Sequence, residues 1–352
     1  MAIQMGKGAD RTWRRLPASP RIAIVGATGA AGSTVLSVLL AHDFPRQFLR
    51  LFASRHSAGR LIEAGGERFQ VEEATPDRLS TVDLAFLSAG AAVSRALAPG
   101  LVRQGAIAID KSSAFRSDPS IPLVVPEVNL SDLDDHNGLI AAPNCVAIPL
   151  SLVLAPLHEA FGLSHVSVAT YQAASGAGTR LLEELQVQRR AAVGGALVEA
   201  HVYPHILYDN VVPGGWRLSS SASTVMEEEE KVVDELRRVL HLPGLDLSVT
   251  TVRVPVSVGH SMALFIEFSE ETSREQVYHT LAGSPGLAMT DDPAEERYPT
   301  PAAARGGDEV LVGRLHETSP DHHRISMFVS SDNLRKGAAL NSVQIAEQLL
   351  PV

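Results

Sequence analysis

The chain has 352 residues, and its 40 acidic and 30 basic side chains give a formal net charge of −10 at pH 7. Sequence-independent nucleic-acid binding requires a basic face, so we expect no nucleic-acid partner. No apolar stretch reaches the length of a membrane helix, so we expect no membrane partner either. The single cysteine excludes an intramolecular disulfide and fits a reducing compartment, which predicts a cytoplasmic protein.

The N-terminal twenty residues differ from the rest of the chain. They contain Lys7, Arg11, Arg14 and Arg15 but no apolar core of the kind found in signal peptides. We interpret residues 1–20 as a flexible extension or an expression remnant. The remaining length suits two domains rather than one core.

A glycine-rich turn follows the first predicted strand. The apolar run 21–25 predicts a buried parallel strand, and a G-x-x-G-x-x-G pattern leads from it into a helix predicted from residue 33 to residue 40. The pattern is close to the dinucleotide fingerprint, in which backbone N–H groups at a helix start bind a pyrophosphate. A purely structural turn is the alternative. The residues of this turn expected to bind the cofactor are Gly26, Thr28, Gly29, Ala30 and Ala31.

The end of the second strand, predicted over residues 48–53, indicates which nicotinamide cofactor binds. NAD specificity usually places an Asp or Glu there to hold the ribose 2′-hydroxyl. This chain has Ser54, Arg55 and Ser57 instead, and no acidic residue at that tip. Hydroxyls and a guanidinium suit a 2′-phosphate, so NADP is favoured, with Arg55 as a solvated loop residue as the alternative.

Three more strands are expected in the same sheet, at residues 82–87, 106–110 and 123–125. The first of them ends in Ser88-Ala89-Gly90, a small-residue turn at the position where open α/β sheets bind ligands. We therefore expect an α/β fold with a Rossmann-type nucleotide-binding domain over 21–143 and 331–352.

The second half changes to longer helices that alternate with strands. Antiparallel strands are predicted at 247–254, 262–268, 309–315 and 325–329, and a final helix at 335–350 is expected to return to the nucleotide-binding domain. Residues 144–330 are therefore interpreted as an α+β catalytic and dimerisation domain with a mixed sheet.

Cys145 lies where a thiol can be activated. Pro143 and Asn144 break regular structure before it, and Pro149 follows where a helix can begin, because proline is tolerated in a first helical turn. The positive end of a helix dipole favours a thiolate. The alternative is a buried packing cysteine.

Further polar residues lie in turns after predicted strands. Gln172 precedes a turn with Ser175 and Gly176 that can admit a flat nicotinamide ring, although a functionless N-cap turn is the alternative. Arg253 can bind a carboxylate in bidentate fashion, and His260 can pass protons near neutral pH. Taken singly, each of these two is as easily structural.

Two basic residues, Arg116 and Lys231, can hold phosphate, with surface charges as the alternative. His201 and His205 are four residues apart, but Pro204 lies between them and makes helical metal-ligand spacing doubtful. We expect no metal site.

Together these segments resemble the aspartate-semialdehyde dehydrogenase family from about residue 21 to the C-terminus. Many matches occur in the same order along the chain. The matching stretches are 26–32, 112–116, 124–129, 143–145, 170–178, 253–255 with 259–260, and 331–339.

The resemblance implies that Cys145 is the nucleophile, that Gln172 orients the substrate and that His260 is the acid/base. It also implies a set of binding residues around them. These are Arg253 for the substrate carboxylate, Arg116 and Lys231 for phosphate, Asn144 and Glu228 for the substrate, and Asn333 beside the nicotinamide.

The implied reaction is the NADPH-dependent reductive dephosphorylation of L-aspartyl 4-phosphate to L-aspartate 4-semialdehyde through a cysteine thioester. It belongs to lysine (diaminopimelate), threonine and methionine biosynthesis. The resemblance implies a homodimer, with a tetramer as the alternative. Rival functions are a reductase of another acyl phosphate or acyl thioester, and an inactive NADP-binding relative.

The chain departs from the family pattern near the proposed nucleophile. Ala142 stands where Asn is usual, Val146 and Ala147 replace Ser or Thr, and Lys111 replaces Asn. The match is also loose over residues 210–216. The changes near Cys145 remove hydrogen-bonding side chains, so we expect the rate or the substrate tolerance to differ.

Overall fold

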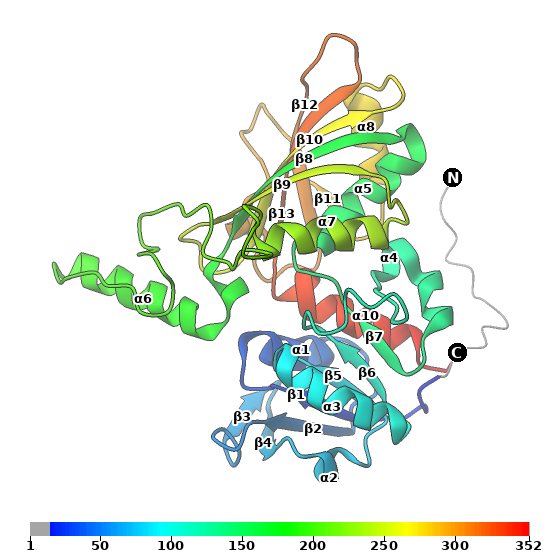
Figure 1. Ribbon diagram of the computed structural model, residues 1–352, viewed down its shortest axis with the longest axis vertical. Helices are drawn as coiled ribbons and strands as arrows, with labels where there is room; N and C mark the ends of the chain where they lie inside the picture. Colours follow the sequence, from blue (N-terminus) through cyan, green and yellow to red (C-terminus); the bar gives the residue numbers. More distant parts are fainter. Residues whose placement is uncertain (1–14, 352) are drawn as a thin grey trace. The chain divides into compact units, whose positions relative to one another are not determined.

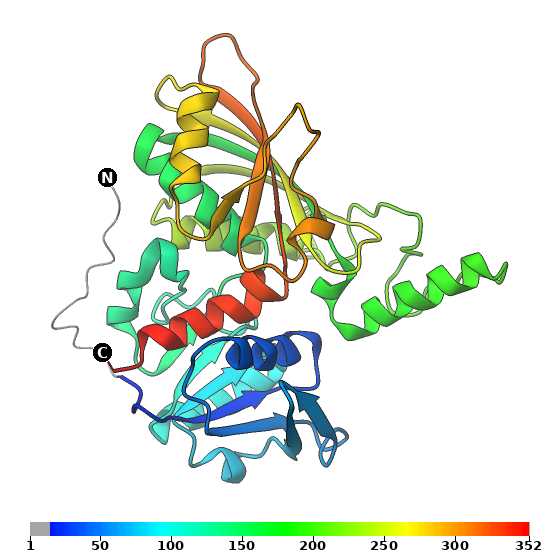
Figure 2. The same cartoon turned by 180° about the vertical axis from the view of Figure 1, so that it is seen from behind.

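The computed structural model describes residues 15–351 (Figures 1 and 2). The chain divides into two compact units, Met1–Pro143 with Ala338–Val352, and Asn144–Gly337. Residues 331–337, expected in the nucleotide-binding domain, therefore belong to the second unit. The reason is that Asn333 accepts hydrogen bonds there from Ser175 and from the Gly259 N–H.

The expected N-terminal extension falls largely on residues 1–14, which lie outside the described part of the chain. Residues 15–20 are described, and flexibility is a wrong prediction for Leu16. Its side chain is buried in the core of the first unit, and its N–H donates to the carbonyl of Leu349 over 2.8 Å.

The first unit contains a seven-stranded sheet in the order β3-β4-β2-β1-β5-β6-β7. All neighbouring strands are parallel except β3, which pairs antiparallel with β4. The parallel part has the Rossmann strand order, and the chain reverses direction across the sheet between β1 and β5. The strands are β1 (Arg21–Val25), β2 (Phe48–Ala53), β3 (Leu61–Ala64), β4 (Glu67–Glu73), β5 (Leu84–Leu87), β6 (Ile107–Asp110) and β7 (Leu139–Ala141).

Helices cover both faces of this sheet, which explains why β1 is apolar throughout. Ile22 and Ile24 share a core with helices α1 (Ala30–Ala41) and α10 (Leu340–Gln348), whereas Ala23 and Val25 face α3 (Ala91–Arg103). The short helices are α2 (Pro76–Leu79), α4 (Pro126–Asn129) and η1 (Leu130–Asp135).

Two details of this unit differ from the predictions. Residues 123–125 form no strand, because Pro122 and Pro126 flank them and only Leu123 bridges to β7. The predicted final helix starts with a π turn, η3 (Arg335–Ala339), before α10.

The second unit is built on a mixed six-stranded sheet in the order β11-β12-β13-β10-β8-β9. β9 was predicted antiparallel, but it pairs parallel with β8. The connection between them is long and contains two α-helices and a short 3-10 helix, and a parallel pair requires such a long crossover. The strands are β8 (Leu163–Gln172), β9 (Asp246–Arg253), β10 (His260–Phe268), β11 (Leu287–Met289), β12 (Val310–Glu317) and β13 (Arg324–Ser331).

Helices α5 (Ala147–Phe161), α7 (Glu227–Val239) and α8 (Arg274–Ala282) pack along one face of this sheet (Figure 1). Successive side chains along β8 and β10 point alternately to the two faces of the sheet. Those on the other face include half-buried or exposed residues, such as Tyr171 and Phe265. The remaining short elements are η2 (Ala174–Ala177) and α9 (Pro301–Ala304).

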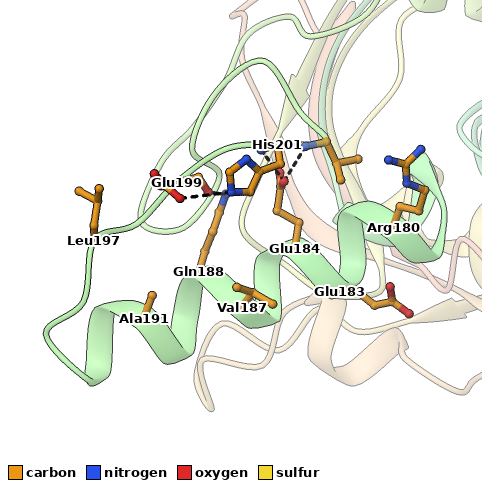
Figure 3. Close-up of a pocket in the computed structure, with 10 residues that line it drawn as sticks. Arg180, Glu183, Glu184, Val187, Gln188, Ala191, Leu197, Glu199 and His201 are labelled. Atoms are coloured by element: carbon orange, nitrogen blue, oxygen red, sulfur yellow. Dashed lines mark hydrogen bonds and ion pairs between the residues drawn. The ribbon is translucent and has the colours of Figure 1, made fainter.

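Helix α6 (Thr179–Val193) and the chain that returns along it extend away from the sheet (Figures 1 and 2), and we call residues 179–208 the arm. Two polar side chains of α6 hold the returning chain. Glu184 accepts the N–H groups of residues 201, 202 and 203, and Gln188 accepts those of residues 207 and 208. Figure 3 shows the shallow pocket left between α6 and this segment, with Val187 and Leu197 on its rim.

Candidate active site

The glycine-rich turn has the geometry that a pyrophosphate requires. Gly26 follows β1 with φ +91°, and the N–H of Gly29 donates to its carbonyl over 3.0 Å. Gly29 is the N-cap of α1, so free N–H groups of the helix start lie at residues 30 and 31. A Cβ on Gly32 would lie 2.1 Å from the Gly26 carbonyl oxygen, so the close packing of turn and helix excludes any side chain there.

The other expected cofactor residues lie at the carboxyl ends of neighbouring strands. Exposed Ser54 and Arg55 and half-buried Ser57 lie in the turn after β2, and the Ser57 N–H donates to the Ser54 carbonyl. A Cβ on Gly26 would lie 2.7 Å from the carbonyl oxygen of Ser88, so the turns after β1 and β5 touch. The Ser88 hydroxyl oxygen is buried and has no hydrogen-bond partner among the described residues. These features fit a bound dinucleotide.

Arg116 belongs to the same unit and forms hydrogen bonds to the backbone after two strands. Its guanidinium donates to the carbonyl of Lys111 after β6 and to that of Ala142 after β7, over 2.6 and 2.9 Å. Both acceptors are backbone carbonyls. The side chains at 111 and 142, which depart from the family pattern, therefore do not affect these hydrogen bonds. Buried Asp110, the last residue of β6, accepts hydrogen bonds from Ser94 of α3 and from Ser112 in the turn that leads to Arg116.

In the second unit, Cys145 lies immediately before α5, whose N-cap is Val146. The Asn144 side-chain oxygen accepts the N–H of Val146 over 2.7 Å, which satisfies one helix-start donor. Val146 and Ala147 are completely buried. Hydroxyl groups in their place would need hydrogen-bond partners in this buried environment.

Helix α7 presents one face to the segment beside Cys145. The Asn144 side-chain amide donates to Glu228 over 2.9 Å, and the Asn144 N–H donates to the buried carboxylate of Glu235. Lys231 lies one turn beyond Glu228 and forms an ion pair with Glu227. The structure thus brings Asn144, Cys145 and Glu228 together, whereas Lys231 contacts an acidic neighbour on its own helix.

Four strands of the six-stranded sheet, β8, β9, β10 and β13, have ends that lie close together. Gln172 ends β8 opposite Arg253, which ends β9, and His260 begins β10 opposite Ser331, which ends β13. All four residues are buried. A Cβ on Gly176 would lie 2.9 Å from the His260 Nε2 atom and 3.2 Å from the Arg253 Nη1 atom, so imidazole and guanidinium meet at this glycine.

The hydrogen bonds of His260 assign its proton. The Nδ1 atom accepts the N–H of Ala173 over 3.0 Å, so the neutral ring carries its hydrogen on Nε2. Burial, and next the positive charge of Arg253, lower the pKa of His260 well below its usual range. His260 is therefore a neutral ring that offers an N–H toward Gly176.

Arg253 has neighbours that the sequence did not predict. Its Nη1 atom donates to the Ala173 carbonyl over 2.7 Å, and its Cζ atom lies 4.5 Å from the centre of the Trp216 ring and 6.0 Å from that of Tyr203. Burial raises the pKa of Tyr203, and the charge of Arg253 opposes this rise. No sequence signal marks either aromatic residue, apart from the two glycines that precede Trp216.

The turn after β13 contacts both the residues around His260 and Cys145. The Asn333 side-chain oxygen accepts from the Ser175 hydroxyl and the Gly259 N–H, next to His260. Four residues later, a Cβ on Gly337 would lie 3.1 Å from the Cβ of Cys145. The turn is closed by a hydrogen bond from the Gly337 N–H to the Asp332 carbonyl. Cys145 and the His260 cluster therefore contact opposite ends of one short turn.

Several buried polar atoms of this cluster have no hydrogen-bond partner within residues 15–351. They are the Arg253 Nε, His260 Nε2, Asn333 Nδ2 and Ser331 Oγ atoms. Leaving a buried donor unpaired costs about 1–3 kcal/mol, so such a group of atoms is typical of a site completed by a polar ligand. An acidic substrate suits the guanidinium, and a nicotinamide carboxamide suits the Asn333 amide.

Comparisons with known proteins identify the family. The family model "Semialdehyde dehydrogenase, NAD binding domain" matches residues 21–136, and "Semialdehyde dehydrogenase, dimerisation domain" matches residues 154–336. An aspartate-semialdehyde dehydrogenase from Bacillus subtilis is 41% identical over 336 residues, covering 93% of this chain and 96% of the relative. The chain belongs to the aspartate-semialdehyde dehydrogenase family.

Solved structures of the family share the fold. Aspartate semialdehyde dehydrogenase II from Vibrio cholerae, solved as a complex with ASA, has a TM-score of 0.89 at 35% identity and covers 96% of this chain and 98% of its own. The Candida albicans enzyme, solved with NADP, has a TM-score of 0.72 at 23% identity, covering 94% of this chain and 98% of its own. The expected Rossmann-type domain and mixed-sheet second domain are therefore confirmed, and a nicotinamide cofactor is supported.

Within residues 15–351, no helix is long and apolar enough to cross a membrane. In the same range, no group of three or more His, Cys, Asp or Glu side chains is arranged to hold a metal ion.

Proposed function

We propose that this protein is an NADPH-dependent, phosphorylating aspartate-semialdehyde dehydrogenase that converts L-aspartyl 4-phosphate to L-aspartate 4-semialdehyde. The observation that carries the proposal is a buried cluster in which the His260 imidazole and the Arg253 guanidinium meet at Gly176, while the 332–337 turn contacts this cluster and Cys145. Among residues 15–351, the His260 Nε2 and Arg253 Nε atoms of this cluster have no hydrogen-bond partner. Membership of the family supports it. By the same reasoning, the enzyme serves the biosynthesis of lysine, threonine and methionine.

The proposed chemistry uses the cysteine as nucleophile. The Cys145 thiolate attacks the acyl carbon, a C–S bond forms, and phosphate leaves with the electron pair of the broken C–O bond. When bound, the nicotinamide cofactor supplies the hydride that reduces the thioester. The C–S bond then breaks, and Cys145 leaves as the thiolate it was at the start.

His260 acts on the reacting oxygen in this proposal. Its Nε2–H is a fixed donor, and the negative charge of both tetrahedral states lies on the former carbonyl oxygen. A single donor of this kind contributes roughly 3–4 kcal/mol to the transition state. His260 does this as a neutral ring, because its Nδ1 atom is occupied by the Ala173 N–H.

The binding roles follow from charge. The Arg253 Nε–H, which has no partner among residues 15–351, suits the substrate carboxylate, and Glu228 beside Asn144 suits the substrate ammonium. Gln172, buried next to Arg253, orients the substrate. Arg116 and Lys231 are proposed for phosphate; for Lys231 this role requires that phosphate compete with Glu227 for its ammonium.

We propose NADP as the cofactor because Ser54, Arg55 and Ser57 form the turn after β2 and offer hydroxyls and a guanidinium. One observation favours NAD instead. Glu73 lies opposite Ala53 in the register of β2 and β4, so a carboxylate is present one strand away. The KM values of Arg55→Ala for NADP⁺ and NAD⁺ distinguish the two cofactors.

We also propose that two copies form a homodimer through the uncovered face of the six-stranded sheet. Small residues there, such as Ser167 and Ala169, pair with Phe265 and Ala263 across β8 and β10. Phe265 is 52% exposed and Tyr171 is 37% exposed, which is unusual for aromatic side chains on a sheet face. The single cysteine keeps the cytoplasm as the expected compartment.

The function is tested by steady-state assays in both directions. We expect reduction of NADP⁺ that requires both aspartate semialdehyde and phosphate, and NADPH oxidation with aspartyl phosphate that exceeds that with glutamyl phosphate in kcat/KM. Equal or better turnover of the longer acyl phosphate indicates the rival reductase. Absence of turnover, with retained cofactor binding, indicates an inactive relative.

A further inference from the structure

The guanidinium of Arg253 is held by aromatic side chains from a segment where the family resemblance is loosest. The Arg253 N–H and carbonyl form an antiparallel bridge with Val212, over 2.8 and 2.9 Å. The chain then turns through Gly214 and Gly215 and reaches Trp216, whose ring centre lies 4.5 Å from the Arg253 Cζ atom. The segment that pairs with the Arg253 backbone thus also covers its side chain.

The path of this segment leaves little freedom for Trp216. The Tyr203 hydroxyl donates to the Gly214 carbonyl over 2.5 Å, and a Cβ on Gly215 would lie 1.9 Å from that same hydroxyl oxygen. Gly214 and Gly215 have φ of +143° and +84°, which favours glycine at both positions. Beyond Trp216, the Glu227 N–H donates to the Arg217 carbonyl and fixes the other end.

The consequence for Arg253 is a single orientation. One edge of the guanidinium is tied to the Ala173 carbonyl through Nη1, and one face is covered by the indole. The Nε–H remains without a partner in the described part of the chain, although Arg253 is only 2% exposed. A donor held in this way loses little conformational freedom when it binds a carboxylate.

We propose that Trp216 is a positioning residue that orients Arg253 for the substrate carboxylate and thereby sets the preference for acidic aldehydes. This inference rests on the proposed function, because it assigns the carboxylate to Arg253. Trp216 acts through stacking and cation–π attraction, which strengthen as water is excluded from the contact. A contact made equally in ground and transition states changes KM rather than kcat.

The test compares Trp216→Leu with Trp216→Phe, using two aldehydes: aspartate semialdehyde and 3-aminopropanal, which lacks the carboxylate. For the leucine variant we expect about a tenfold higher KM for aspartate semialdehyde, with kcat and the KM values for phosphate and NADP⁺ within about twofold of wild type. We expect no change in kcat/KM for 3-aminopropanal. The phenylalanine variant keeps an aromatic face and should recover most of the loss.

A wild-type KM in Trp216→Leu overturns the inference, and so does an equal loss for both aldehydes, because a general structural defect affects both. A wild-type enzyme with no turnover of aspartate semialdehyde contradicts the proposed function instead. The two failures are therefore distinct.

Fluorescence keeps the inference testable if the leucine variant does not fold. Trp13 is the only other tryptophan in the chain, so Trp13→Phe leaves Trp216 as the sole indole emitter. We expect its emission to change saturably with L-2-aminobutyrate, which carries the carboxylate and amino group without a reactive carbon, and not with propylamine. The same response to both compounds, or to neither, contradicts a coupling between Trp216 and the carboxylate site.

Discussion

The two units offer different kinds of chemical group to their proposed ligands. In the first unit, the turn after β1 offers backbone N–H groups at a helix start, and glycines at 26 and 32 keep side chains away from them. In the second unit, the donors are buried side chains, chiefly those of Arg253 and His260, each oriented by a hydrogen bond to the backbone of Ala173. A site made of backbone groups loses ligand binding when a side chain is added nearby. A site made of side chains loses ligand binding when the neighbouring residues that orient those side chains are removed.

The largest expected effect comes from adding one methyl group to the backbone site. Gly32→Ala places a Cβ 2.1 Å from the Gly26 carbonyl oxygen, so the turn must move. We expect at least about a hundredfold weaker NADPH binding by fluorescence titration, together with a lower melting temperature. Gly100→Ala in α3 is the matched control, because a Cβ there meets only the end of Arg103, and it should bind NADPH normally. Normal binding by Gly32→Ala contradicts the turn geometry.

The side-chain site predicts a pH-dependent stability. The pKa of His260 is lowered in the folded state, so below about pH 6.5 the unfolded chain takes up a proton that the folded protein resists. Stability is therefore present above that pH and is lost as pH falls. For one such group we expect an extra slope of up to about 1.4 kcal/mol per pH unit.

Urea unfolding of wild type and His260→Asn between pH 5 and 8 measures this slope. The variant should lose the extra dependence below pH 6.5, whereas His279→Gln, a change at an exposed histidine, should keep it. Parallel curves for wild type and His260→Asn are the result that speaks against a buried neutral ring.

The difference between backbone groups in the first unit and buried side chains in the second also explains how much of each could be predicted from the sequence. A glycine turn is formed by residues close together in the sequence. The spacing of Gly26, Gly29 and Gly32 after an apolar run was therefore sufficient to predict the turn and the helix that follows it. The strand-end cluster depends on which strands pair, and the parallel pairing of β9 with β8 was not predicted. The position of Trp216 depends on the Val212–Arg253 bridge, which joins residues forty-one positions apart and leaves no periodic pattern.

The smallest expected effect concerns the choice of cofactor. Arg55→Ala removes one charge-assisted contact to the 2′-phosphate, which should raise KM for NADP⁺ about tenfold and leave KM for NAD⁺ unchanged. Arg68→Ala, at an exposed arginine on β4 that pairs with Glu63, is the control and should change neither value. Equal effects of Arg55→Ala on both cofactors indicate that Arg55 does not select the phosphate.

The central claim is that Cys145 forms a covalent bond with the acyl group. Its most direct test is intact-protein mass spectrometry after rapid mixing with aspartyl phosphate in the absence of NADPH. The account predicts a mass increase of one aspartyl group that maps to Cys145, disappears when NADPH is added, and is absent in Cys145→Ser. Undiminished turnover by Cys145→Ser, or an aspartyl group on another residue, contradicts it.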